Sequence, residues 1–221
     1  MRVAIAGAHG QIGLILGRRL SEGGDTVVGL IRKPGQQDDL REAGVEPAVV
    51  DLESASVDEV AAALRGADAV VFAAGAGPGS DAGRKDGVDR AGAVLLADAA
   101  EAAGVGRYVL VSSMGVEQVR DGATPGGMED AFVTYLRAKL AAEDDVRARP
   151  FAWTVLRPGA LTDGAGTGQV RLAPSVPRGD VPRNDVADVI VALLHAPAGV
   201  GMVLELCSGG IAIEAAVASA R

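Results

Sequence analysis

Near its start the chain has the segment Arg2-Val3-Ala4-Ile5-Ala6-Gly7-Ala8-His9-Gly10-Gln11-Ile12-Gly13-Leu14-Ile15-Leu16. This segment is the strongest indication of the fold in the sequence. Residues 2–6 form a short apolar run with β-branched side chains, which is typical of a buried strand. Residues 14–20 place apolar side chains at helical spacing. Glycines separate the two patterns. A strand, a glycine-rich turn and a helix in this order indicate the first half of a βαβ unit.

The three glycines of the turn have separate roles when such a unit binds a dinucleotide. Gly7 permits the sharp exit from the strand, Gly10 leaves room for phosphates, and Gly13 lets the helix lie close to the sheet. The phosphates would then sit at the positive end of the helix dipole. The spacing is Gly-x-x-Gly-x-x-Gly rather than Gly-x-Gly-x-x-Gly. We predict that the turn binds a dinucleotide, with Gly7, His9, Gly10, Gln11, Ile12 and Gly13 as cofactor-binding residues. The side chain of His9 could touch a phosphate or point to solvent.

The composition limits the class of protein and of partner. The 221 residues, 48% of them hydrophobic, suffice for one α/β domain spanning residues 1–221. A net charge of −8 argues against nucleic acid or an anionic membrane as partner. Cys207 is the only cysteine and no His/Asp/Glu cluster has ligand spacing, so we predict no disulfide and no metal site. The start has no signal-peptide pattern, and we expect a cytoplasmic protein with a small-molecule substrate. The oligomeric state is left open.

Strand-like and helix-like segments alternate along the chain, which predicts a doubly wound parallel sheet of six or more strands with helices on both faces. Residues 117–127 are polar and broken by glycine and proline, and we interpret them as a mobile flap. Residues 159–183 are rich in glycine and proline, with only a brief strand-like run at 169–173, and we interpret them as a segment that covers the substrate. The predicted strands are 2–6, 25–31, 47–50, 68–75, 107–111, 152–156 and 202–207.

The end of the second predicted strand carries Arg32 and Lys33 where an NAD-specific fold usually has an acid. A guanidinium fork and an ammonium suit the 2′-phosphate of NADP, so we predict that NADP(H) is preferred over NAD(H). A solvated basic loop is the alternative interpretation. Asp51 and Leu52 follow the third strand at the rim where adenine would lie, although Asp51 could equally cap the next turn.

Later segments bring polar side chains to the same edge of the sheet. Ala73-Ala74-Gly75 ends the fourth strand with small residues that leave room for the ribose and nicotinamide. The fifth strand leads into Ser112 and Ser113; strand alternation turns only one of them toward the site and does not say which. Tyr135 and Lys139 are four residues apart and therefore share a helix face.

These pieces resemble the short-chain dehydrogenase/reductase superfamily, in particular its atypical NAD(P)H-binding branch related to NmrA-like proteins and sugar epimerases. The resemblance covers nearly the whole chain and implies a Rossmann-type fold, a nicotinamide cofactor and hydride transfer. Its motifs, in family order, are Gly7-x-x-Gly10-x-x-Gly13, Asp51-Leu52, Ala73-Ala74-Gly75, Val111-Ser112-Ser113, Tyr135-x-x-x-Lys139 and Arg157-Pro158-Gly159.

The resemblance also implies roles for individual residues. Tyr135 would exchange a proton with a substrate oxygen, and Ser113 or Ser112 would hydrogen-bond that oxygen. Lys139 would lower the pKa of the phenol and hold the ribose hydroxyls, with Ser112 and Pro158 also beside the cofactor. This predicts an NAD(P)H-dependent oxidoreductase of a small carbonyl-type substrate. Two alternatives stay open: an NADP(H)-binding redox sensor or regulator without turnover, and an epimerase or isomerase that retains its cofactor.

Overall fold

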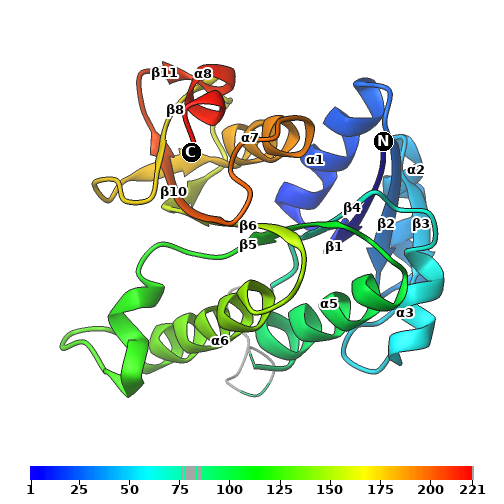
Figure 1. Cartoon of the computed structure of the whole chain (residues 1–221), viewed down its shortest axis with the longest axis horizontal. Helices are drawn as coiled ribbons and strands as arrows, with labels where there is room; N and C mark the ends of the chain where they lie inside the picture. The colour runs from blue at the N-terminus through cyan, green and yellow to red at the C-terminus, as the bar shows by residue number, and fades with distance from the viewer. Residues whose placement is uncertain (76, 78–82, 84–85, 221) are drawn as a thin grey trace.

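The computed structural model describes residues 1–75, 77, 83 and 86–220, and these form one nine-stranded sheet between two layers of helices (Figure 1). The strand order is β11-β8-β10-β6-β5-β4-β1-β2-β3. All neighbours from β10 to β3 are parallel, while β8 runs antiparallel to both β10 and β11. The strands are β1 Arg2–Ala6, β2 Thr26–Ile31, β3 Glu46–Val49, β4 Ala69–Phe72, β5 Arg107–Val111, β6 Ala152–Pro158, β8 Gln169–Ala173, β10 Met202–Ser208 and β11 Ile211–Ala212.

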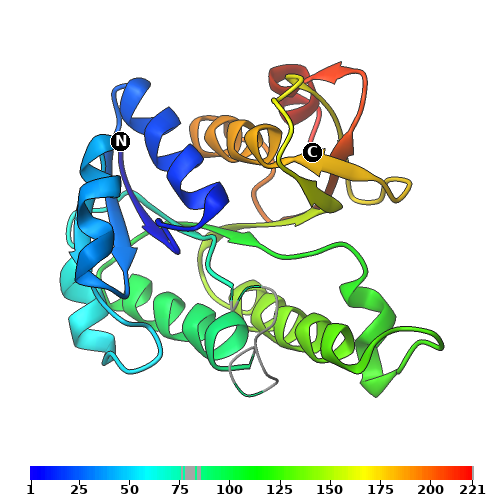
Figure 2. The ribbon, with the colours of Figure 1, turned by 180° about the vertical axis from the view of Figure 1, so that it is seen from behind.

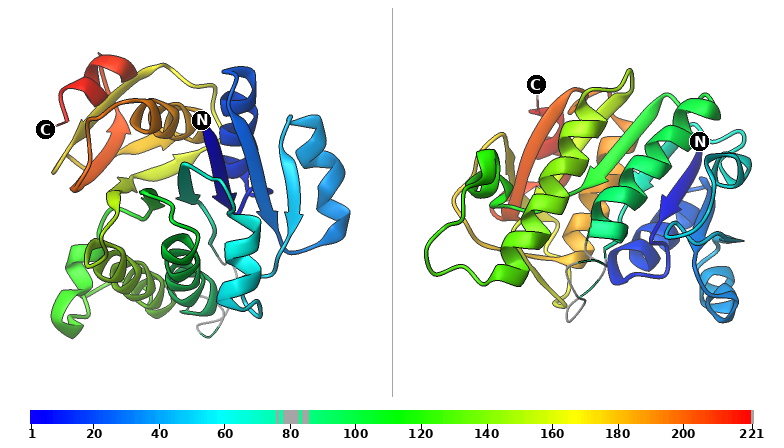
Figure 3. Two further views of the ribbon diagram at one scale, coloured as in Figure 1. Left: turned by 45° about the vertical axis from the view of Figure 1, so that its right-hand side comes forward. Right: turned by 90° about the horizontal axis from the view of Figure 1, so that it is seen from below.

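Helices cover both faces of the sheet, so the predicted doubly wound α/β fold is confirmed. Figures 1 and 2 show α1 and α7 side by side on one face. That layer contains α1 Gln11–Glu22, α2 Gln37–Glu42, α7 Arg183–His195 and α8 Ile213–Ala218. The opposite layer contains α3 Val57–Ala63, α5 Gly92–Ala102 and α6 Asp130–Arg147, with α5 and α6 adjacent in Figure 3.

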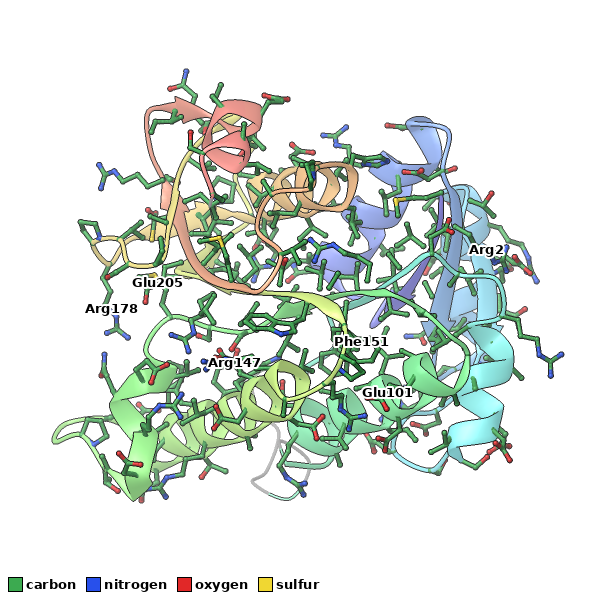
Figure 4. All side chains as sticks on the ribbon, in the orientation of Figure 1. Arg2, Glu101, Arg147, Phe151, Arg178 and Glu205 are labelled. Carbon is green, nitrogen blue, oxygen red and sulfur yellow. The ribbon has the colours of Figure 1, made fainter. Side chains whose placement is uncertain are left out.

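The central strands are buried on both sides because each face of the sheet has its own apolar core. Leu16 of α1 and Ile190 of α7 are fully buried on one side. On the other side, the ring of Phe151 packs 5.4 Å from that of Tyr108, and Figure 4 shows Phe151 between the sheet and the helices. Burial on both faces explains why β4 and β5 are almost continuously apolar.

Two segments that we interpreted as largely irregular contain more regular structure than expected, although the brief strand predicted at residues 169–173 is confirmed as β8. The expected flap includes a 3₁₀ helix, η3 Val116–Gly122, whose Val116 and Val119 are buried against α6. The expected substrate-covering segment contains β8, with the fully buried Val170, and also β7 Ala160–Thr162 and β9 Asp180–Pro182, which form a small parallel sheet. Two further short helices are η1 Pro34–Gln36 and η2 Asp86–Ala91.

Candidate functional site

The turn between β1 and α1 brings three backbone segments into close contact. Gly7 has a φ of +80°, which glycine adopts without the penalty that a Cβ would bring. A Cβ added at Gly7 would lie 2.6 Å from the backbone nitrogen of Ala74, and one added at Gly13 would overlap the carbonyl oxygen of Gly7. Glycine is therefore required at both positions by the packing of the turn against β4 and α1.

The first turn of α1 is open toward a ligand. Gly10 precedes the helix, no side chain caps it, and its first turn contains no acidic residue. Its leading backbone N–H groups thus have no partner within the helix, and the helix dipole adds partial positive charge there. An uncapped helix start beside a turn without Cβ atoms fits a pyrophosphate, so the residues present suit a dinucleotide.

Two cavities flank this turn along the carboxyl edge of the sheet. The first has a volume of about 330 Å³ and the second about 850 Å³. Gly10 and the segment Ala73-Ala74-Gly75 line both cavities. The two halves of a dinucleotide could therefore occupy the two cavities with the pyrophosphate at the junction, which is the arrangement of ligands at a switch point of a doubly wound sheet.

Ion pairs at the surface line the first cavity. The Nη1 atom of Arg32 lies 3.4 Å from Oε1 of Glu53, and Asp51 accepts a hydrogen bond of 3.0 Å from the backbone nitrogen of Glu53. Asp51 thus caps its own turn, the alternative that the sequence left open, and also lines the cavity. The ring of His9 lies between Asp39 at 2.6 Å and Gln36 at 3.0 Å.

The second cavity contains Tyr135 and Lys139, which α6 presents on one face. Lys139 is buried and its Nζ lies 3.1 Å from Asp89, 3.0 Å from the carbonyl oxygen of Val111 and 3.3 Å from that of Ala74. An ammonium group has three N–H donors, and three protein acceptors surround this one. The same nitrogen is 5.9 Å from the centre of the Tyr135 ring.

A buried layer of charges lies directly beneath Ser112. The hydroxyl of Ser112 donates to Oε1 of Glu143 at 2.5 Å. Arg157 donates to both oxygens of Glu143, at 2.9 Å through Nε and 2.5 Å through Nη2, and also to Glu117 at 2.6 Å. Arg120 in turn donates to Glu117 at the surface. Glu143 is fully buried and lies four residues after Lys139, on the same face of α6.

The charges of this layer support one another. Burial is the largest single influence on the pKa of Arg157, and it lowers this pKa. Glu143 and Glu117 together outweigh burial, so the pKa of Arg157 is raised. The hydrogen bond from Arg120 is the main reason that the pKa of Glu117 is lowered to about 2, with further help from Arg157 and against the effect of burial. Glu117 therefore stays ionised at neutral pH.

At the rim of the second cavity, hydrogen bonds join α1 and α7 to the chain that follows β7. Asp163 accepts a hydrogen bond of 2.6 Å from Arg183 and one of 3.3 Å from Gln11. The rings of Phe132 and Tyr135 stack with centres 5.8 Å apart. A planar apolar surface and a guanidinium group thus border the same cavity.

Most of the residues singled out from the sequence meet around the two cavities. The first cavity collects Gly7, His9, Gly10, Arg32, Asp51, Leu52, Ala73, Ala74 and Gly75, and the second adds Gln11, Ile12, Ser112, Tyr135 and Lys139. Four others do not line either cavity: Gly13, Lys33, Ser113 and Pro158. The hydroxyl of Ser113 donates to the carbonyl oxygen of Met114 instead.

Sequence reasoning missed Asp89, Glu143 and Arg183. The helical spacing of Tyr135, Lys139 and Glu143 was a usable signal for the carboxylate, whereas Asp89 carries no local pattern. Among the described residues, no cluster of His, Cys, Asp or Glu is arranged to hold a metal ion. Within the same residues, no helix has the length and apolar character needed to span a membrane.

Comparison with known proteins connects this geometry to a family. Residues 7–197 match the sequence model of an NAD(P)H-binding family. The chain is 34% identical over 195 residues to a Bacillus subtilis protein, the uncharacterized sugar epimerase YhfK, with 88% of each chain covered.

Two solved structures share the whole fold. A Bacillus halodurans protein, provisionally named an NAD-dependent epimerase/dehydratase, superposes with a TM-score of 0.89 at 32% identity and 99% coverage of both chains. ChuY of Escherichia coli O157:H7, named an anaerobillin reductase, superposes with a TM-score of 0.80 at 28% identity, covering 94% of this chain and 97% of ChuY.

Proposed function

The chain belongs to the NAD(P)H-binding family, and we therefore propose that it is an NADPH-dependent oxidoreductase that reduces a small carbonyl-type substrate. The observation that carries the proposal is the second cavity. It opens onto the glycine turn and is lined by Tyr135, Ser112 and Lys139. The name of ChuY, a reductase, supports the same class of reaction.

The first cavity supports the choice of NADPH. Arg32 lines it with its guanidinium group beside Glu53, and no acid takes the position at the end of β2 that would bind a ribose 2′-hydroxyl. Exchange of the Glu53 contact for a 2′-phosphate would keep the charge of Arg32 balanced. Lys33 lies outside the lining and adds at most a long-range attraction.

The residues of the second cavity would complete the reduction. When bound, NADPH would supply the hydride that reduces the carbonyl carbon. Tyr135 donates its phenolic proton to the carbonyl oxygen, so that the substrate becomes an alcohol, and it recovers a proton from water. Lys139 donates to the carbonyl oxygens of Ala74 and Val111 and forms an ion pair with Asp89, which favours a role in positioning the ends of β4 and β5 over direct contact with the ribose.

A second candidate function is binding of NADP(H) without turnover, as in a redox sensor. One observation favours it: Lys139 forms a buried ion pair with Asp89, so its charge is already balanced within the protein. An epimerase or isomerase that retains its cofactor is a third candidate, supported by the name of YhfK. Cofactor that stays bound through purification would favour this third function.

The test follows NADPH absorbance with a panel of carbonyl compounds. We expect Tyr135→Phe to lower turnover by about 10²-fold or more, the scale of a positioned general acid, with NADPH affinity nearly unchanged. Tyr108→Phe is the matched control, because Tyr108 is buried under α5 and its hydroxyl donates to the carbonyl oxygen of Ala93. Equal turnover in Tyr135→Phe and the parent protein would assign the proton to another group.

A further inference from the structure

We propose that Ser112 offers only hydrogen-bond acceptor lone pairs to the second cavity, so that the ligand group bound there is an N–H or O–H donor. Glu143 is the positioning residue that fixes this polarity. The inference rests on the proposed function in one respect, namely that NADPH or a carbonyl substrate occupies the second cavity. It reverses the role that the family resemblance implies for a serine at this strand end, which is donation to a substrate oxygen.

The first step concerns the single proton of the serine hydroxyl. A hydroxyl group has one donor and two acceptor lone pairs. The Oγ atom of Ser112 directs its proton to Oε1 of Glu143 at 2.5 Å. Both residues are buried, Ser112 at 5% exposure and Glu143 at 0%, so water does not compete for this bond. The proton of Ser112 is therefore unavailable to a ligand.

The second step shows that Glu143 accepts and does not donate. Arg157 contributes hydrogen bonds to both carboxyl oxygens, and its guanidinium group keeps its charge at any ordinary pH. Two N–H groups of Arg157 and the hydroxyl of Ser112 thus point at the two oxygens of Glu143, so both oxygens act as acceptors. The bond with Ser112 therefore has one direction only.

The third step concerns the remaining lone pairs of Ser112. Within the described part of the chain, no N–H or O–H group donates to its Oγ atom. Lys139 lines the same cavity, where it donates to the carbonyl oxygens of Ala74 and Val111 and forms an ion pair with Asp89. Ser112 itself lines the cavity. A ligand donor is the partner that completes its hydrogen bonding.

This polarity excludes one arrangement and favours two others. A carbonyl oxygen placed against Ser112 would set two acceptors face to face, and a buried polar group without a partner is unfavourable. An N–H group satisfies both sides. In the proposed complex such a group comes either from the carboxamide of the nicotinamide or from the substrate, and two pairs of probes distinguish these sources.

The first pair of probes is NADPH and its reduced 3-acetylpyridine analogue, in which a methyl ketone replaces the carboxamide and removes the N–H donors. Dissociation constants are measured by calorimetry for the parent protein, Ser112→Ala and Ser113→Ala. If Ser112 binds the carboxamide, Ser112→Ala reduces the preference for NADPH over the analogue by about 2- to 10-fold, the scale of one neutral hydrogen bond. Ser113→Ala is the matched control and leaves the preference unchanged.

The second pair is isatin and N-methylisatin, two planar carbonyl compounds that differ by one N–H donor. Their affinities are measured with the NADP⁺-loaded protein, so no turnover is needed. If Ser112 binds the substrate, Ser112→Ala reduces the preference for isatin by about 2- to 10-fold and leaves the preference between the two cofactors intact.

Glu143→Gln tests the positioning role. A carboxamide offers one acceptor oxygen to the three donors that now converge on Glu143, so the hydroxyl of Ser112 is free to turn its proton toward the cavity. In whichever pair of probes responds to Ser112→Ala, we expect Glu143→Gln to reduce the preference for the N–H donor to the value measured for Ser112→Ala. If this variant does not fold, Ser112→Ala decides alone.

The proposal is overturned if a folded Ser112→Ala protein changes neither the preference for NADPH over its analogue nor the preference for isatin over N-methylisatin by more than about twofold. It is also overturned if neither pair of probes binds. The outcome is separate from that of the proposed function. If Ser112→Ala changes a preference but the protein shows no turnover, the inference about Ser112 stands and the oxidoreductase function is rejected. If the protein turns over a carbonyl substrate but neither preference changes, the oxidoreductase function stands and the inference is rejected.

Discussion

The two cavities meet at the same glycine turn, yet their charges are held in opposite ways. In the first cavity, Arg32 and Glu53 form a pair whose side chains are 39% and 36% exposed. Beneath the second cavity, Arg157 and Glu143 form a pair at 6% and 0% exposure. Water screens the first pair and leaves its cation available to a phosphate, whereas the second pair is rigid and inaccessible to a ligand. The exposed charge suits binding, and the buried one suits positioning.

The largest effect that separates the two regions is on stability. Arg157→Ala leaves the carboxylate of Glu143 buried without its cation, and we expect a loss of about 3–5 kcal/mol in the free energy of unfolding. Arg32→Ala is the control, because an exposed pair contributes at most about 1 kcal/mol. Urea denaturation followed by circular dichroism measures both. Similar losses of unfolding free energy in the two variants would show that the burial of an ion pair does not determine its contribution to stability.

The features that the sequence predicted are those set by local geometry. The glycine turn, the order of strands and helices, and the shared face of Tyr135 and Lys139 all depend on residues close together in the chain. Periodicity and turn chemistry report such features directly. The same holds for Arg32 and Asp51, which follow strand ends and therefore reach the carboxyl edge of the sheet.

The features that the sequence did not predict depend on contacts between distant segments. Lys139 has the expected place in α6, but it forms an ion pair with Asp89, fifty positions earlier in the chain. The buried layer requires Glu143 to meet Arg157 of β6, and no local pattern indicates that pairing. Strand alternation left Ser112 and Ser113 equivalent, and only the position of α6 distinguishes them. Helical spacing could have suggested Glu143 as a third residue of that face.

An intermediate effect tests whether the exposed cation of the first cavity acts on a ligand. Loss of a charge-assisted contact in Arg32→Ala costs about 1.5–3 kcal/mol, so we expect NADPH to bind roughly 10- to 150-fold more weakly. NADH affinity stays nearly unchanged, because NADH has no 2′-phosphate. Lys33→Ala is the matched control, since Lys33 does not line the cavity. Calorimetric titration of the three proteins measures the affinities, and an equal loss for NADPH and NADH would reject the predicted preference.

The smallest effect lies where the buried layer reaches water, at Glu117. Arg120 and Arg157 hold the pKa of this carboxyl at about 2, below the value of about 4.3 expected in the unfolded chain. A lowered pKa in the folded state stabilises the protein above the unfolded value, and this contribution disappears as the pH falls through the folded value. The side chain is half exposed, so solvent screening keeps the contribution small.

The corresponding experiment compares the parent protein with Glu117→Gln. We expect the parent to have the higher melting temperature at pH 7, because only it retains the carboxylate that pairs with Arg120 and Arg157. Below about pH 4.5 the difference should narrow, and most of it should be lost near pH 2, where Glu117 is protonated in the unfolded chain and half protonated in the folded protein. Thermal melts from pH 7 to about pH 2 measure this convergence. A difference in melting temperature that stays constant over that range would mean that Glu117 stabilises the protein through its packing and not through its charge. The exposed end of the buried layer would then be held by packing, whereas its centre is held by the ion pair of Glu143 and Arg157.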